Sequence, residues 1–176
     1  MNPTLQAQFN DIESSRKALF SYLAKYPDEV LNKQPAPGSW SAVQVIEHLL
    51  SSEEASLKYL QKKTLDTSKA QKAGLAGKWR LLKTKLVFAV PLKFKAPEAL
   101  APDNAFVKLA DLEQRYNNVR SATIQLLGKL SDSELEKELW KNIISGKMNV
   151  YQMLEFFGFH FDRHRAQIER AVKQVQ

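Results

Sequence analysis

Hydrophobic residues recur at three- and four-residue steps along four long stretches of the chain. This spacing is typical of helices that bury one face and expose the other. The stretches cover residues 5–26, 41–63, 106–129 and 149–176. The last of these is the most strongly patterned, and Gly158 is its only glycine. The pattern therefore predicts four long helices.

Two of the predicted helices begin with a capping signal. Ser41 precedes Gln44 by three residues, and Asn149 precedes Gln152 by the same distance. In this arrangement each side chain bonds the backbone N–H of the other residue, which satisfies donors that a helix start leaves unpaired. We expect the second and fourth helices to start at these positions.

The interval between the second and third helices is harder to interpret. GLAGKWRLLKTKLVFAV, which starts at Gly74, predicts a short basic amphipathic helix, and Pro91 and Pro97 then favour a long extended connection. No run alternates with a two-residue period and no hairpin signal is present. The expected fold is all-α: a single domain over residues 1–176, built as a four-helix bundle with a long cross-connection.

The composition limits location and chemistry. No apolar run reaches the roughly 18–20 residues of a membrane helix, and the first fifteen residues are polar, so we expect a cytoplasmic protein without a membrane span. The chain has no cysteine. Any bound metal must therefore be held by His, Asp or Glu side chains.

Positive charge is concentrated in one segment. The chain carries a net charge of +7, but residues 62–95 hold ten Lys and Arg against Asp66, for +9, so the remainder carries −2. The segment is interpreted as a solvated helix face, as a cationic wall for a carboxylate-bearing substrate that includes Lys93 and Lys95, or as a surface for anionic lipid or nucleic acid. An unevenly placed charge does not predict specific nucleic-acid binding.

The chain has three histidines, and two of them stand four residues apart in the fourth helix. His160 and His164 share one face of that helix with its apolar stripe, and His48 lies at the edge of the apolar arc of the second helix. A buried imidazole without a partner is costly. The rings are either core histidines satisfied by local hydrogen bonds or ligands of one metal ion, and the spacing leaves both interpretations open.

The segments PGSWSAVQVIEHLLSSEEA and NVYQMLEFFGFHFDRHRAQI resemble the two signature helices of the DinB/YfiT-like superfamily. In that pattern one histidine follows a tryptophan in an SxxEHL-like context, and an HxxxH pair precedes Gln-Ile, here Gln167 and Ile168. The resemblance implies a four-helix bundle with one divalent metal ion, Zn, Ni or Fe, held by His48, His160 and His164. Three protein ligands leave a coordination position open.

The resemblance implies a metal-dependent hydrolase or a low-molecular-weight thiol transferase that acts on a small substrate, with an anionic thiol among the candidates. The alternative is a non-catalytic protein in which the ion staples two helices and the basic segment binds a partner. A homodimer is left open. No residue is assigned as a general acid or base.

Four further residues neighbour the predicted ligands. Glu47, Glu155 and Asp162 are favoured as solvent-facing carboxylates, although each could orient an imidazole N–H. Trp40 is favoured as a hydrophobic staple or lid of the bundle. Two other kinds of site are excluded: GLAGKWR lacks the spacing and the Ser or Thr of a phosphate loop, and no GxSxG motif is present.

Overall fold

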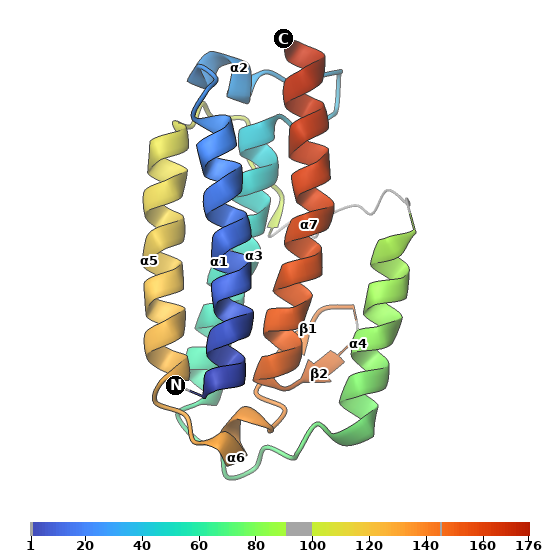
Figure 1. Ribbon diagram of the computed structural model, residues 1–176. Helices are drawn as coiled ribbons and strands as arrows, with labels where there is room; N and C mark the ends of the chain where they lie inside the picture. The colour runs from blue at the N-terminus through green and yellow to red at the C-terminus, as the bar shows by residue number, and fades with distance from the viewer. Residues whose placement is uncertain (1, 91–99, 145) are drawn as a thin grey trace.

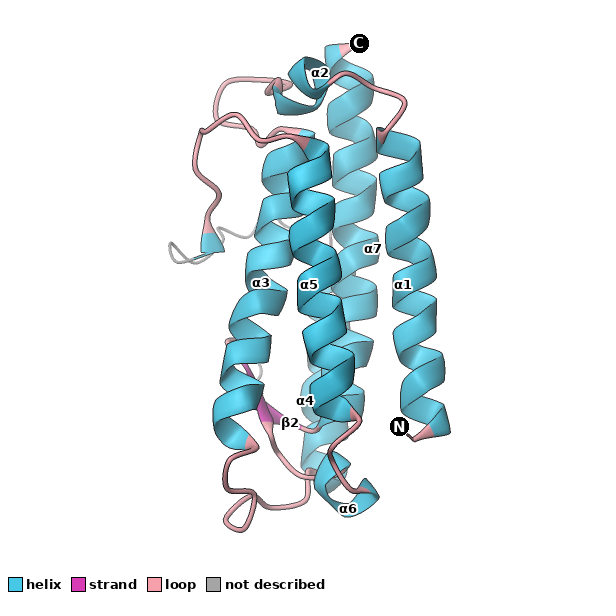
Figure 2. Ribbon diagram, turned by 90° about the vertical axis from the view of Figure 1, so that its left-hand side faces the viewer, coloured by secondary structure: helices cyan, strands magenta, loops and turns pink. Residues whose placement is uncertain are grey.

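Four long helices lie side by side and form a bundle in the computed structural model, which describes residues 2–90, 100–144 and 146–176 (Figures 1 and 2). They are α1 (Pro3–Leu23), α3 (Ala42–Lys63), α5 (Leu109–Leu127) and α7 (Val150–Val175). Short helices lie at the two ends of the bundle: α2 (Asp28–Asn32) and α6 (Asp132–Leu135). The predicted all-α bundle is confirmed. Among the described residues, no helix has both the length and the apolar character needed to cross a bilayer.

Both predicted capping boxes are present. The backbone N–H of Gln44 donates to Ser41 Oγ at 3.3 Å, and the N–H of Ser41 donates to Gln44 Oε1 at 2.9 Å. Asn149 and Gln152 make the same reciprocal pair at 2.9 and 3.0 Å. The starts of α3 and α7 are therefore fixed by local side chains, and these two helices carry the three histidines.

The helix predicted from residue 106 begins later, at Leu109. The side chain of Asn32 bonds both the N–H and the carbonyl oxygen of Val107, at 3.0 and 2.9 Å, and Asp28 accepts the N–H of Leu109 at 2.9 Å. Two residues of α2 thus bind the backbone just before α5 and at its first residue. The hydrophobic spacing of residues 106–109 contains no signal for these long-range bonds, so it could not predict the later start of the helix.

The expectation that the chain contains no hairpin is wrong. β1 (Trp140–Asn142) and β2 (Gly146–Met148) pair antiparallel, with Trp140 opposite Met148 and Asn142 opposite Gly146. Each strand has three residues, which is too short for a two-residue alternation to be recognised. Gly146 has a φ of +88°, a conformation that glycine adopts without strain, and it begins the second strand.

The predicted helix after Gly74 is present as α4 (Gly74–Ala89), outside the bundle and beside α7 (Figure 1). Leu81 and Thr84 on its inner side are buried. A Cβ added at Gly77 would lie 2.8 Å from the side-chain amide of Gln152, so a glycine allows the close approach to the start of α7. The predicted extended connection through Pro91 and Pro97 falls outside the described residues.

The bundle core consists of two clusters stacked along its axis. One joins the C-terminal part of α1 to the N-terminal part of α3 and includes Phe161 of α7. The other joins the N-terminal part of α1 to the hairpin and α4, and it includes Phe156 and Phe157 of α7. The clusters meet on α7 between Phe157 and Phe161, which is where His160 lies.

A buried ion pair also links α3 to α5. Arg120 donates to Glu53 Oε1 at 2.6 Å, and the Tyr116 hydroxyl donates to the same oxygen at 3.1 Å. Burial raises the pKa of Tyr116 well above 10, so this hydroxyl stays protonated and able to donate. Burial also raises the pKa of Glu53, and the charge of Arg120 offsets part of that rise. Glu13 of α1 completes the group, 3.3 Å from Arg120 Nε.

Replacing one member of this pair should destabilise the fold more than replacing both. Arg120→Leu leaves the Glu53 carboxylate buried without its partner, and we expect it to lower the free energy of unfolding by about 3–5 kcal/mol. The double variant Arg120→Leu/Glu53→Leu should recover most of that loss, as urea denaturation would show. A loss below about 1 kcal/mol in the single variant, the range of a surface pair, would contradict this prediction.

Candidate metal centre

The three histidines come together between α3 and α7. Their potential ligand nitrogens all lie within 4.8 Å of one another, although His48 is more than a hundred residues from the other two. The ring centroids of His160 and His164 are 4.7 Å apart, and that of His48 lies 5.6 and 5.0 Å from them. Among the described residues, no carboxylate belongs to this group. The arrangement can hold one metal ion through three imidazoles.

Aromatic rings surround the cluster on several sides. Phe156 stacks on His160 at 5.0 Å between ring centroids, and Phe88 of α4 meets the same ring edge-on at 5.7 Å. Trp40 lies 5.2 Å from the ring of His48, so its expected position as a lid of the bundle places it against the site. His48 and His160 are 7% and 6% exposed. The cluster is thus largely shielded from water, and His164 is its half-buried member.

Two hydrogen bonds fix the tautomers of two rings. Nδ1 of His48 lies 3.0 Å from the carbonyl oxygen of Leu100, and Nδ1 of His164 lies 2.9 Å from Gln167 Oε1. Carbonyl oxygens only accept, so each Nδ1 carries the proton and donates. In a neutral ring the Nε2 atom then keeps its lone pair, which is the form that ligates a metal.

Burial keeps the imidazoles neutral. It lowers the pKa of His48, lowers that of His160 well below its usual range, and lowers that of His164 to about 4. The other histidines of the cluster lower the pKa values of His160 and His164 further, because two adjacent positive rings repel each other. At neutral pH the rings therefore offer lone pairs without first losing a proton.

The carboxylates that neighbour the histidines in sequence form no hydrogen bond with the imidazole rings among the described residues. Glu47 lies 3.6 Å from Arg115, Glu155 pairs with Lys85, and Asp162 is exposed. The groups that do orient the rings are Gln167 and the carbonyl of Leu100. The place of Gln167 three residues after His164, on the same helix face, could have indicated its role, whereas nothing in the sequence marks a backbone carbonyl 52 residues from His48.

The described part of the basic segment does not form a cationic wall at the cluster. α4 meets His160 through Phe88, and two of its cations pair with carboxylates, Lys85 with Glu155 and Arg80 with Glu138 at 2.7 Å. Lys93 and Lys95 lie outside the described residues, so a contribution from them stays a prediction.

Comparison with known sequences places the chain in a family. Residues 11–168 match the sequence profile of the DinB superfamily. The chain belongs to the DinB superfamily. The match spans the bundle from α1 to α7 and contains all three histidines, so the resemblance seen in two segments extends over most of the chain.

A relative of this DinB-superfamily chain occurs in Bacillus subtilis (strain 168). It is the uncharacterized protein YuaE, 22% identical over 170 residues, which are 92% of this chain and 95% of YuaE. The two chains are therefore similar over nearly their whole lengths. No solved structure matches the chain with significance.

Acid should destabilise the metal-free protein through these histidines. Unfolded histidines take up a proton near pH 6.5, whereas folded His164 does so only near pH 4, so protons favour the unfolded chain between these values. Above about pH 6.5 the contribution of His164 to the free energy of unfolding is at its full value. It is lost as the pH falls to about 4, by on the order of 3 kcal/mol.

Urea denaturation in the presence of a chelator, at several pH values, measures this loss. His164→Gln removes one of the titrating rings and should flatten the pH dependence, whereas the exposed Asp162→Asn on the same helix should retain most of it. Equal slopes for wild type and His164→Gln would show that the ring does not carry the effect.

Proposed function

We propose that this chain is a metal-dependent enzyme that acts on a small molecule, by hydrolysis or by transfer of a low-molecular-weight thiol. The observation that carries the proposal is the cluster of three neutral imidazoles, two buried and one half-buried, without a carboxylate among the described residues. His48, His160 and His164 would hold one divalent ion of the borderline class, such as Zn, Ni or Fe. When bound, such an ion lowers the pKa of a water or thiol and polarises a substrate.

A pocket beside the cluster supports a small-molecule substrate. It has a volume of about 650 Å³, within the range of ligand pockets, and Trp40 lines it while also contacting the ring of His48. Gln44, one helical turn before His48, faces the same pocket together with Asn32, Gln34 and Asn104. Its described lining has amides and no charged side chain, which suits a polar substrate whose orientation is fixed by hydrogen bonds.

The residues of the chain would do three things in this reaction. The carbonyl of Leu100 and the amide of Gln167 hold two imidazoles with Nε2 free to ligate. Phe88, Phe156 and Trp40 restrict the access of water to the cluster. The amides of Gln34 and Asn104 would position the substrate in the pocket beside Trp40. Those of Asn32 and Gln44 already use both their oxygen and their nitrogen in other bonds.

The first test is metal content. The purified protein should contain about one divalent ion per chain, and His160→Ala or His164→Ala should remove most of it, because two imidazoles hold an ion far more weakly than three. Elemental analysis by mass spectrometry measures this, with Asp162→Asn as a control on the same helix. Wild-type metal content in both histidine variants would refute the three-histidine site.

The second test separates an enzyme from a protein that uses the ion only as a staple. Cobalt(II) in place of the native ion reports its ligands through visible absorption. If a coordination position is open, a small thiol should change the spectrum of the cobalt-loaded protein and add a sulfur-to-metal charge-transfer band. A spectrum that thiol, azide and imidazole all leave unchanged would indicate a closed structural site.

A further inference from the structure

The outer face of α4 carries four large apolar side chains that are open to water. Leu75, Trp79, Leu82 and Leu86 are 73%, 63%, 45% and 61% exposed. At about 100° per residue they fall within an arc of about 60°, so they form one continuous stripe along the helix. We refer to these four residues as the α4 stripe.

The fold does not need the α4 stripe. The opposite side of the same helix already packs on the protein, through buried Leu81 and Thr84 and through Phe88, whose ring contacts Phe156 and His160. A helix that is apolar on two opposite faces has more apolar surface than its own domain covers. A cluster of exposed large apolar residues of this kind indicates an interaction surface.

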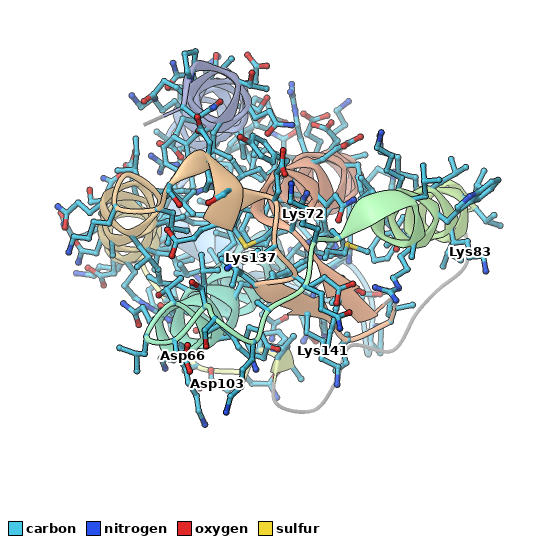
Figure 3. All side chains as sticks on the ribbon, turned by 90° about the horizontal axis from the view of Figure 1, so that it is seen from below. Asp66, Lys72, Lys83, Asp103, Lys137 and Lys141 are labelled. Atoms are coloured by element: carbon cyan, nitrogen blue, oxygen red, sulfur yellow. The ribbon has the colours of Figure 1, made fainter. Side chains whose placement is uncertain are left out.

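Lysines flank the α4 stripe on both sides. By the same helical spacing, Lys78 and Lys85 lie along one edge and Lys83 along the other. α4 has no acidic residue. Lys83 projects from the outer side of α4, away from the bundle (Figure 3). Within the described part of the chain, no ion pair joins Lys78 or Lys83 to a carboxylate, so their charges are available to a partner.

A recess beside the α4 stripe adds a place for an anionic group. A cavity of about 760 Å³ lies between α4 and the start of α7, and Leu75, Leu82 and Lys78 line it together with Lys72 and Lys85. Glu136 and Glu155 pair with Lys72 and Lys85, which leaves Lys78 as the cation without such a partner among the described lining residues.

We propose that α4 docks the protein on the surface of a membrane that contains anionic phospholipids. The helix would lie in the plane of the interface, with the α4 stripe in the boundary between headgroups and acyl chains and the flanking lysines at lipid phosphates. Leucine and tryptophan on one face and lysine at its edges are the composition of interfacial helices. The +9 charge of residues 62–95 attracts the segment to an anionic surface.

The charge pattern disfavours two other occupants. In a symmetric pair of chains joined through the α4 stripe, the Lys78 and Lys83 side chains of both copies would approach one another, and like charges at an interface weaken it. The phosphates of a nucleic acid would bind the lysines. They would not bind the exposed leucines, so nucleic acid leaves the apolar part of the face unexplained. A lipid interface satisfies both the apolar and the cationic parts of the face.

Sedimentation of the full-length protein with lipid vesicles tests the proposal. We expect binding to vesicles of phosphatidylcholine with one-quarter phosphatidylglycerol, little binding to phosphatidylcholine alone, and loss of binding at high salt. The fluorescence of wild type minus that of Trp79→Phe should shift to the blue on binding. Chelation of metal should leave binding unchanged, so the result is independent of the proposed enzymatic function.

Paired variants separate the two parts of the face. Leu82→Gln/Leu86→Gln should weaken vesicle binding by at least about tenfold, because both side chains leave the apolar boundary. Lys78→Gln/Lys83→Gln should weaken it by about fivefold per lysine. The controls are matched in exposure. One is Ile143→Gln/Ile144→Gln in the hairpin, whose side chains are 71% and 55% exposed in wild type. The other is Lys17→Gln/Lys25→Gln, at exposed positions on α1 and in the turn that follows it.

Several results would overturn the proposal. One is equal binding to neutral and anionic vesicles, or no binding to either; another is an equal loss in the control variants. A concentration-dependent dimer in sedimentation velocity that Leu82→Gln/Leu86→Gln dissociates would assign the α4 stripe to a second copy. Tight binding of duplex DNA that the leucine variant leaves intact, without vesicle binding, would assign the segment to nucleic acid.

Discussion

The cost of burying imidazole rings governs how α3 and α7 meet. Three neutral rings share one shielded region, and each ring nitrogen there must donate, accept or ligate to offset the loss of water. Two nitrogens are satisfied by Leu100 and Gln167. No hydrogen bond joins His160 to another described residue, so a nitrogen of this ring is available to a ligand. Phe88 and Phe156 contact this ring and limit the access of water to it.

A second buried polar group, between α3 and α5, offsets the cost of burial in another way. There Glu53 accepts hydrogen bonds from Arg120 and Tyr116, and Glu13 forms a second ion pair with Arg120. The histidine cluster contains bases but no carboxylate among the described residues, and burial together with the charge of Arg163 lowers the pKa values of His160 and His164. The Glu53 group therefore links helices through opposite charges, whereas the histidine cluster offers neutral ring nitrogens, which is why the proposed chemistry is assigned to the histidines.

Local signals in the sequence were sufficient for much of this architecture. The capping pairs of Ser41 and Asn149 and the inward placement of His160 and His164 follow from spacings of three and four residues, which a helix converts directly into proximity. Features that depend on distant residues could not be obtained this way. Asp28 sets the start of α5, a three-residue pairing forms the hairpin, and Leu100 orients His48, and none of these has a periodic signature.

The hydrogen bond from His48 to Leu100 has a consequence for how this protein can vary. The acceptor is a carbonyl oxygen, which every amino acid supplies, so the identity of the residue at this position is free to drift as far as the bond is concerned. The requirement is that a backbone carbonyl oxygen lies within hydrogen-bond distance of His48 Nδ1. A substitution at position 100 therefore leaves the acceptor of this bond in place.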